Sequence, residues 1–351
     1  MVSLSDILLN NTSLHTPGSG PIVALVGCTS GIGLSTLHAF LKHTSAPTIY
    51  LIGRDSSRLT SLIAQVQPLN PSATLHPIVG DDLTLIRDAQ HAAEQITSHS
   101  QAAPPPRLDI LVMSQGFLSF ASTPDFSPEG LDRITSIRYH SRMRILVTLL
   151  PLLRRSASPR VLNILGAGKE GALDLSDLGM TKSPGTSTYG PLYAAGAAGS
   201  MTTLFLEELS KRPGNEKIVF IHLFPGLVAG TGLKVQGPGS SFWVRFLWDY
   251  IAKPILSMVS YSFSEAGERV LFAATNGRFR RLPPGTSAEG TLIQQGSDGT
   301  QGSGVYTINA DSSVIGGGGN ADLRKLRGMN AGQEVYEYTM AEFRRIDNLQ
   351  R

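Results

Sequence analysis

Three glycines, Gly27, Gly31 and Gly33, lie between an apolar run at 22–26 and a segment at 34–41 whose apolar residues have helical spacing. A buried strand followed by a glycine-rich turn and a helix is the arrangement that binds a dinucleotide. The glycines permit a tight turn and close approach of the backbone, and the free amides of the helix N-terminus attract a pyrophosphate. We therefore predict a phosphate-binding turn whose contact residues are Gly27, Thr29, Ser30, Gly31, Ile32 and Gly33.

The residue that follows the second predicted strand, at 48–53, indicates which dinucleotide is bound. An Asp or Glu there would bind the ribose hydroxyls and favour NAD, whereas a basic residue can bind the 2′-phosphate of NADP. The chain has Arg54 at this position, followed by Asp55, and a guanidinium suits a phosphate through paired hydrogen bonds. We predict NADP as the cofactor. The alternative is that Arg54 is merely solvated and Asp55 caps the next helix.

Strand and helix patterns alternate along the chain and must position this turn. Apolar runs and helical spacing predict strands at 22–26, 48–53, 74–79, 108–113, 160–165 and 217–224, and helices at 34–41, 56–66, 83–96, 131–153 and 189–211. Such alternation predicts an α/β Rossmann fold, a doubly wound parallel sheet with helices on both faces. Later in the chain we predict helices at 242–263, 265–274 and 333–346, a Gly-rich loop at 283–304 and an edge strand at 305–309. The expected units are an N-terminal extension at 1–20, a dinucleotide-binding domain at 21–235, and a C-terminal extension at 236–351 that covers the substrate.

The segment at 242–263 combines aromatic residues with three charges spaced four apart, Arg245, Asp249 and Lys253. Such an amphipathic helix could lie on a membrane interface with its aromatic side inserted. Its charges, and Pro254, argue against a transmembrane span. The alternative is a lid over an apolar substrate or a contact with a dimer partner, since soluble helices commonly have this pattern.

The composition limits the classes of protein that the chain can belong to. It has 351 residues, 41% hydrophobic and 16% charged, which excludes disorder throughout. Its net charge of +3 is too small, and too evenly scattered along the chain, to predict a nucleic-acid partner. The single cysteine, Cys28, excludes a disulfide framework, and we expect it to fill space in the turn rather than to react. Residues 1–20 do not resemble a secretory signal. We expect a cytoplasmic protein without a metal site.

The turn resembles that of the short-chain dehydrogenase/reductase family, usually written TGxxxGIG, with Val26 in place of the first Thr. The resemblance continues to residue 235. Asp82-Leu83 resembles the family segment that contacts adenine, and Pro225-Gly226-Leu227-Val228 resembles the PGxV segment at the nicotinamide end. The strand-four signature NNAG is changed to Met113-Ser114-Gln115-Gly116. The resemblance implies further cofactor contacts from Asp82, Leu83, Ser114, Gly116, Pro225, Gly226 and Val228.

The family's catalytic residues are absent from the matching positions. In the family a Tyr acts as acid and base, a Lys four residues later lowers its pKa, a Ser holds the carbonyl and an Asn supports a water. The matching positions here carry Pro191, Ala195, Gly166 and Arg138. A carbonyl that accepts a hydride needs a proton from a tuned acid, and a tyrosine without the Lys would keep a pKa of about 10.

Four side chains are the predicted replacements. Tyr193 is the first choice, and Tyr189 lies on the other side of the expected Tyr position. Lys169, in the loop after the fifth strand, could donate or orient a proton. Arg138, with Arg142 one helical turn later, could stabilise an enolate or bind a carboxylate. The alternatives are packing and capping for the tyrosines, solvation for Lys169, and a partner surface for the arginines.

More narrowly, the chain resembles fungal short-chain dehydrogenase-like proteins encoded with secondary-metabolite pathways. The resemblance is carried by the helix RYHSRMRILVTLLPLL, the loop Gly168-Lys169-Glu170-Gly171 and the segment Gly304-Val305-Tyr306. It implies a hydrophobic terpenoid or polyketide substrate. In the family two helices commonly form a homodimer interface, which the prolines and arginines here could disrupt. Three functions stay open: an NADP-dependent oxidoreductase acting on a hydroxyl or ketone, a non-redox isomerase or cyclase, and a catalytically silent NADP-binding protein.

Overall fold

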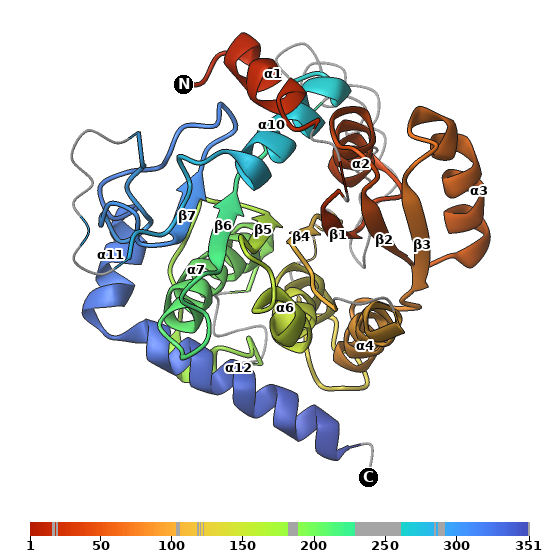
Figure 1. Ribbon diagram of the computed structural model, residues 1–351. Helices are drawn as coiled ribbons and strands as arrows, with labels where there is room; N and C mark the ends of the chain where they lie inside the picture. Colours follow the sequence, from red (N-terminus) through yellow and green to blue (C-terminus); the bar gives the residue numbers. More distant parts are fainter. Residues whose placement is uncertain are drawn as a thin grey trace, which may run out of the picture.

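The computed structural model describes residues 1–15, 18, 20–102, 106–117, 119, 121, 123–181, 189–228, 261–283, 286 and 292–349. Within them, a seven-stranded parallel sheet has the order β3-β2-β1-β4-β5-β6-β7 (Figure 1). The strands are β1 (Ile22–Val26), β2 (Thr48–Gly53), β3 (Thr74–Val79), β4 (Ile110–Met113), β5 (Arg160–Ile164), β6 (Val219–Leu223) and β7 (Val305–Ile308). The strand order reverses between β1 and β4, which is where doubly wound sheets bind their ligands. The predicted Rossmann fold is confirmed.

Helices cover both faces of the sheet. One face carries α4 (Ile86–Ala102), α6 (Ser141–Leu153) and α7 (Pro191–Ser210), and the other carries α2 (Gly31–His43), α3 (Ser56–Val66) and α10 (Phe263–Thr275). Alternate residues of β1 belong to different cores: Ala24 and Val26 pack with the first set of helices, Val23 and Leu25 with the second. Burial on both faces explains why this strand is continuously apolar.

The helix predicted at 131–153 is not uniform. It begins with α5 (Arg133–Thr135), continues through a π-helical turn, η2 (Ser136–His140), and becomes α6. A π turn inside an α-helix commonly marks a functional site. This turn contains Arg138, whose guanidinium donates to the carbonyl of Phe117 in the segment after β4.

The boundaries of the other predicted helices differ less from those in the structure. Helix α4 begins at Ile86 rather than at 83 and extends to Ala102. Two helices were not predicted, α1 (Leu4–Thr12) and α11 (Ala321–Gly328), because neither has a long apolar stripe; α1 buries only Ile7 and Asn11. The short turns η1 (Gln67–Leu69) and η3 (Leu175–Asp177) complete the described elements before the last helix, α12 (Ala331–Asn348). The helix predicted at 242–263 lies, up to residue 260, outside the described residues.

The C-terminal helix α12 lies along α7 and reaches toward α6 and α4 (Figure 1). Its Thr339 and Phe343 are buried, and the hydroxyl groups of Thr339 and Tyr139 lie 2.6 Å apart. The guanidinium of Arg144 on α6 lies over the Phe343 ring, 5.1 Å from its centre. Helix α12 therefore covers the outer side of α6 and α7.

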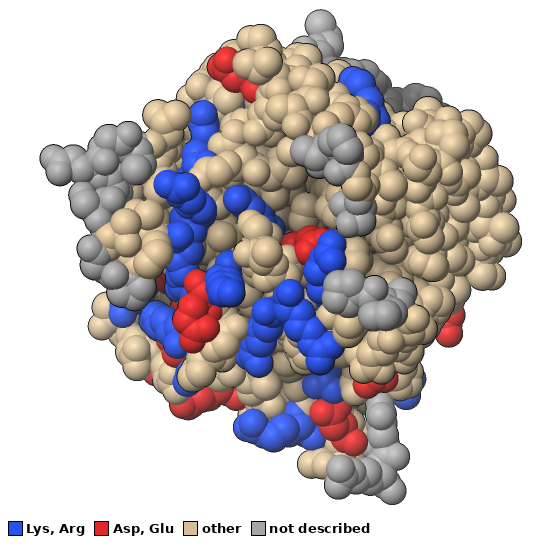
Figure 2. Space-filling model, in the orientation of Figure 1, with Lys and Arg blue, Asp and Glu red and all other residues tan. Residues whose placement is uncertain are grey.

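Folding brings together basic residues that are spread along the chain. Lys and Arg side chains gather on the face that Figure 2 shows, over α6 and α7 and around β7. Arg154 and Arg155 directly follow α6, and Lys211 and Arg212 directly follow α7. These helix ends lie at the amino edge of the sheet, so this basic surface is opposite the carboxyl edge, where α/β sheets bind ligands. Among the described residues, no helix is both long enough and apolar enough to cross a membrane.

Candidate functional site

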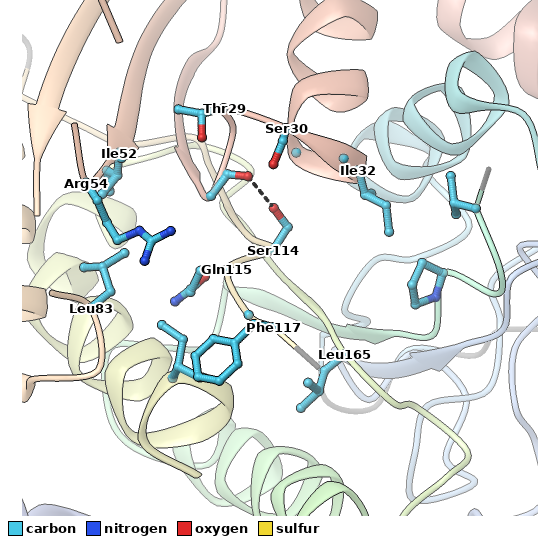
Figure 3. A pocket seen from close by; sticks show the side chains of 18 of the residues that line it. Thr29, Ser30, Ile32, Ile52, Arg54, Leu83, Ser114, Gln115, Phe117 and Leu165 are labelled. Carbon is cyan, nitrogen blue, oxygen red and sulfur yellow. Dashed lines mark hydrogen bonds between the residues drawn. The ribbon is translucent and has the colours of Figure 1, made fainter. Parts of the chain in front are cut away.

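The turn after β1 brings three backbone segments into close contact. Gly27 has φ +81°, and a Cβ added to it would lie 2.8 Å from the backbone nitrogen of Gln115. A Cβ added to Gly33 would lie 2.4 Å from the carbonyl oxygen of Gly27 and 2.6 Å from Oγ of Ser114. The Ser114 hydroxyl in turn donates to the carbonyl of Gly27 at 3.3 Å (Figure 3). Only glycine fits at these two positions, because any side chain would push the turn away from β4.

The N-terminus of α2 has the free amides that a phosphate requires. Its N-cap residue, Ser30, makes no side-chain hydrogen bond to the first turn. By contrast, the next helix, α3, is capped by Asp55, whose carboxylate accepts from the backbone N–H of Arg58 at 3.1 Å. Uncapped amides and the helix dipole favour an anion. The glycine turn and this helix end together fit a pyrophosphate.

A cavity of about 560 Å³ opens above this turn at the carboxyl edge of β1, β2, β4 and β6. Every residue predicted to contact the dinucleotide lines it: Gly27, Thr29, Ser30, Gly31, Ile32, Gly33, Arg54, Asp82, Leu83, Ser114, Gly116, Pro225, Gly226 and Val228. The lining residues that were not predicted are Ile52, Gly53, Arg58, Thr84, Gln115, Phe117, Ile137, Leu165 and Phe224. The topology thus brings segments from positions 27 to 228 of the chain around one space.

One end of the cavity is basic. Arg54 points into it beside Leu83 (Figure 3), and Arg58 also lines it and donates to the carbonyl of Thr29 at 3.1 Å. Asp55 faces its own helix as the cap, where hydrogen bonds from Ser57 and from the backbone N–H of Arg58 lower its pKa. Asp55 therefore caps α3, as the alternative interpretation predicted, whereas Arg54 faces the cavity, as the NADP interpretation predicted. Arg58 was not predicted to line the cavity. The sequence feature that could have indicated it is its spacing, since it is a basic residue four positions after Arg54.

Asp82 lies at the neighbouring wall. Its carboxylate accepts from the backbone N–H and hydroxyl of Thr84 and from Arg133 at 3.0 Å. Burial would raise the pKa of Asp82, but these hydrogen bonds from Thr84 and Arg133 outweigh it and hold the pKa below its usual value. The carboxylate therefore fixes the turn after β3 and positions Leu83 against the cavity.

The other end of the cavity is apolar. Phe117 and Leu165 lie across the cavity from Arg54 (Figure 3), and Ile137 and Phe224 add to this wall. Among the described lining residues, the titratable ones are Arg54, Arg58 and Asp82. None of them is at this end, so the described wall there has no acid or base of its own.

The two predicted tyrosines do not line the described cavity. The Tyr189 hydroxyl donates to the buried carboxylate of Asp132 at 3.0 Å, and burial together with Asp132 raises the pKa of Tyr189 well above its usual value. The Tyr193 oxygen accepts from the backbone N–H of Asp174 at 3.3 Å. Both rings pack in a small cluster with Met180.

Lys169 and Arg138 lie closer to the apolar end. The Lys169 ammonium lies over the ring of Phe224, 5.6 Å from its centre. Arg138 donates to the carbonyl of Phe117 at 3.4 Å. Both aromatic residues line the cavity, so each of these two cations contacts a lining residue without lining the described cavity itself.

A family model for short chain dehydrogenases matches residues 21–236. The chain belongs to the short-chain dehydrogenase family. An oxidoreductase from Emericella nidulans, AN1596, is 32% identical over 90% of this chain and 90% of its own length. The short-chain dehydrogenase/reductase SAT2 of Stachybotrys chartarum is 30% identical over 85% of each chain. This member of the short-chain dehydrogenase family is therefore an oxidoreductase of the short-chain type with fungal relatives.

Solved structures of low sequence identity have a similar fold. The L-sorbose reductase of Gluconobacter frateurii, solved with NADPH and L-sorbose, matches with a TM-score of 0.52 and 18% identity, over 74% of this chain and 90% of that chain. At this identity the likeness concerns the fold. This chain has the sheet, the phosphate turn and the cavity that a short-chain dehydrogenase requires. The predicted replacement of the family's catalytic residues by Gly166, Pro191 and Ala195 stays a prediction.

Proposed function

We propose that the chain binds NADP(H) in this cavity and transfers a hydride to or from a ketone or hydroxyl of a hydrophobic secondary metabolite, a terpenoid or polyketide. One observation carries the proposal: the residues that the sequence assigned to a dinucleotide all line a single cavity, with two arginines at one end. The apolar opposite wall supports a hydrophobic substrate, because apolar ligands bind in apolar pockets.

The basic end supports NADP rather than NAD. Arg54 and Arg58 can both reach a 2′-phosphate near Thr29, since all three residues line the cavity and also a smaller recess beside it. Asp55, the acidic residue nearest to them in the chain, is engaged as the cap of α3. A carboxylate aimed at the ribose would have favoured NAD.

The remaining contacts follow from the same placement. The uncapped amides of α2 would hold the pyrophosphate, and Asp82 and Leu83 would contact the adenine. Ser114 and Gly116 would contact the ribose, and Pro225, Gly226 and Val228 would contact the nicotinamide. When bound, NADPH supplies the hydride.

The chain's own side chains must supply the proton and stabilise the oxygen. Lys169 replaces Tyr193 as our first candidate for proton donation because its ammonium contacts the lining residue Phe224, although like the tyrosines it does not itself line the described cavity. We assign stabilisation of the negative oxygen to Arg138. Tyr193 and Tyr189 remain the alternative donors; the hydrogen bond from Tyr189 to Asp132 makes that phenol a weaker acid. Phe117 and Leu165 exclude water from the reacting atoms.

A non-redox isomerase or cyclase is the second candidate. It is favoured by the apolar wall, whose described lining residues include no acid or base. Such an enzyme would use the same pocket without net oxidation of NADPH.

Calorimetry with NADPH and NADH tests the cofactor. We expect tight binding of NADPH, weaker binding of NADH, and a loss of about tenfold in NADPH affinity in Arg54→Ala and in Arg58→Ala, the loss that about 1.4 kcal/mol of phosphate hydrogen bonding produces. Neither variant should change NADH affinity. Absence of binding by both nucleotides would refute the proposal.

A panel of terpenoid and polyketide ketones then tests hydride transfer by loss of NADPH absorbance. Lys169→Met, Tyr193→Phe and Tyr189→Phe assign the donor: the correct variant loses kcat while its NADPH affinity is retained. Turnover of a substrate without loss of NADPH absorbance would favour the isomerase or cyclase.

The position of α12 limits which surface could form a homodimer interface. Helix α12 covers the outer side of α6 and α7, the helices that correspond to the two through which family members commonly form a homodimer. We propose that the protein acts in the cytoplasm and that any homodimer uses a surface other than these two helices.

A further inference from the structure

A fully buried guanidinium lies beneath the apolar end of the cavity. Arg142, on α6, donates from Nη1 to the carbonyls of Met113 and Ile164, at 3.1 and 2.9 Å, and from Nη2 to the carbonyl of Gln115. Its Nε has no hydrogen-bond partner. Gln115 lines the cavity, and Ile164 directly precedes another lining residue, Leu165. The positive charge thus lies directly under the cavity floor, where β4 and β5 end.

A second guanidinium lies one helical turn earlier. Arg138 is 9% exposed, donates to the carbonyl of Phe117, and leaves its Nη1 without a hydrogen-bond partner. In the described part of the chain, neither arginine has a carboxylate oxygen within 4 Å. We call Arg138 and Arg142 the buried arginine pair.

The groups around the pair do not cancel its charge. The imidazole of His222 lies on the same side of the sheet end, and burial together with the charge of Arg142 lowers its pKa to about 3, so it is neutral. Asp132 influences Arg138 from beyond ion-pair distance and is itself bonded to Tyr189 and Thr135. Backbone carbonyls supply dipoles but no net charge. Glu170 is buried with Oε1 3.6 Å from Nδ1 of His222 and accepts from Thr203, and burial raises its pKa. It forms no ion pair with either arginine of the pair, so the positive charge of the pair acts at this end of the cavity.

We propose that the buried arginine pair makes the site select NADPH over NADP⁺, so that the protein works as a reductase. This inference rests on the proposed function and further assumes that the nicotinamide lies at the apolar end of the cavity, whose wall includes Phe117 and Leu165. The two forms of the cofactor share their phosphates and differ by one positive charge, which NADP⁺ carries on its nicotinamide ring. A fixed cation behind a dry apolar wall repels that ring and leaves the neutral ring of NADPH unaffected. With NADPH as the bound form, the substrate is a carbonyl compound, which the transferred hydride and a proton convert to a hydroxyl compound.

The test compares the affinities of NADPH and NADP⁺ by calorimetry on the full chain. In the wild type we expect NADPH to bind at least about tenfold more tightly, a ratio that about 1.4 kcal/mol produces. Arg138→Gln and Arg142→Gln each remove one charge and should move this ratio toward one by strengthening NADP⁺ binding. Arg142 holds the ends of two strands, so its variant could fail to fold. Arg138→Gln loses a single long hydrogen bond and is therefore the deciding variant for the affinity ratio.

Arg144→Gln is the matched control. Arg144 lies on the same helix and is 8% exposed, but it contacts Gln90 and Asp347 on the side toward α4 and α12. Its variant should keep the wild-type ratio. Adenosine 2′,5′-bisphosphate, which lacks the nicotinamide, should bind wild type and Arg138→Gln equally. Equal affinities for NADPH and NADP⁺ in the wild type, or an unchanged ratio in Arg138→Gln, would overturn the inference while leaving the proposed function intact. Failure of both nucleotides to bind would overturn both.

Discussion

The backbone N–H of Gly166 donates a hydrogen bond to Nε2 of His222 at 3.2 Å. Since Nε2 accepts, the imidazole proton is on Nδ1, which lies 2.8 Å from the hydroxyl oxygen of Thr203. That hydroxyl donates to Glu170 at 2.9 Å. This chain of hydrogen bonds links the loop after β5 to β6 and α7 and fixes the position of Gly166.

Removing the central hydroxyl of this chain should destabilise the fold. Thr203→Val leaves His222 and Glu170 without their shared partner, and we expect the free energy of unfolding to fall by about 1–3 kcal/mol, measured by chemical denaturation. The matched control is Thr202→Val, because the Thr202 hydroxyl is buried without a hydrogen-bond partner and its loss should be neutral or stabilising. Equal effects of the two substitutions would contradict a role for this hydrogen-bond chain.

Two buried histidines should make stability depend on pH below neutrality. Burial lowers the pKa of His222 and of His140 to about 3, whereas an unfolded histidine titrates near 6.5. As the pH falls from about 6.5 toward 3, the unfolded chain takes up two protons that the folded chain excludes. The stability present above pH 6.5 is thus lost at up to about 2.7 kcal/mol per pH unit.

Denaturation curves at pH 5 and at pH 4 measure this slope. His222→Gln should reduce it by about 1.4 kcal/mol per pH unit, the contribution of one proton. A variant with the wild-type slope would mean that His222 is protonated in the folded protein.

The phosphate turn should not tolerate a methyl group at its third glycine. In Gly33→Ala the new Cβ would meet the carbonyl oxygen of Gly27 and the hydroxyl of Ser114 at distances that real contacts do not reach. We expect NADPH binding to be lost and the free energy of unfolding to fall by about 1–3 kcal/mol. Gly328→Ala, in open space at the end of α11, should change neither, and normal NADPH binding by Gly33→Ala would show that the turn does not hold the phosphates.

The single cysteine should be inert in the folded protein. Cys28 is fully buried, and burial raises the pKa of its thiol to about 12, although backbone hydrogen bonds partly oppose the shift. At pH 8 the thiolate is absent, so a disulfide reagent should modify Cys28 only after denaturation. Rapid stoichiometric modification of the native protein would contradict this assignment.

Much of the fold follows from local patterns. The apolar run of β1 and the spacing of Gly27, Gly31 and Gly33 predict both a strand and a phosphate turn, because backbone conformation and hydrophobic period are properties of neighbouring residues. The family resemblance added the later contacts, such as Asp82 and Ser114, but other lining residues, such as Phe117 and Leu165, were not predicted. Helix α1 escaped prediction because its stability comes from contacts with α10, such as the bond from Asn11 to Glu268, rather than from its own periodicity.

The reacting end of the site could not be predicted in the same way. Tyr189 and Tyr193 have the right chemistry in the sequence, yet their hydroxyls bond to Asp132 and to the backbone of Asp174, partners that lie far away or in another element. Arg142 was noted only as a neighbour of Arg138, whereas the fold places it under the ends of two strands. Which side chains meet, and which charge stays uncompensated, depends on how distant segments pack, since the packing sets burial, hydrogen-bond partners and the local field.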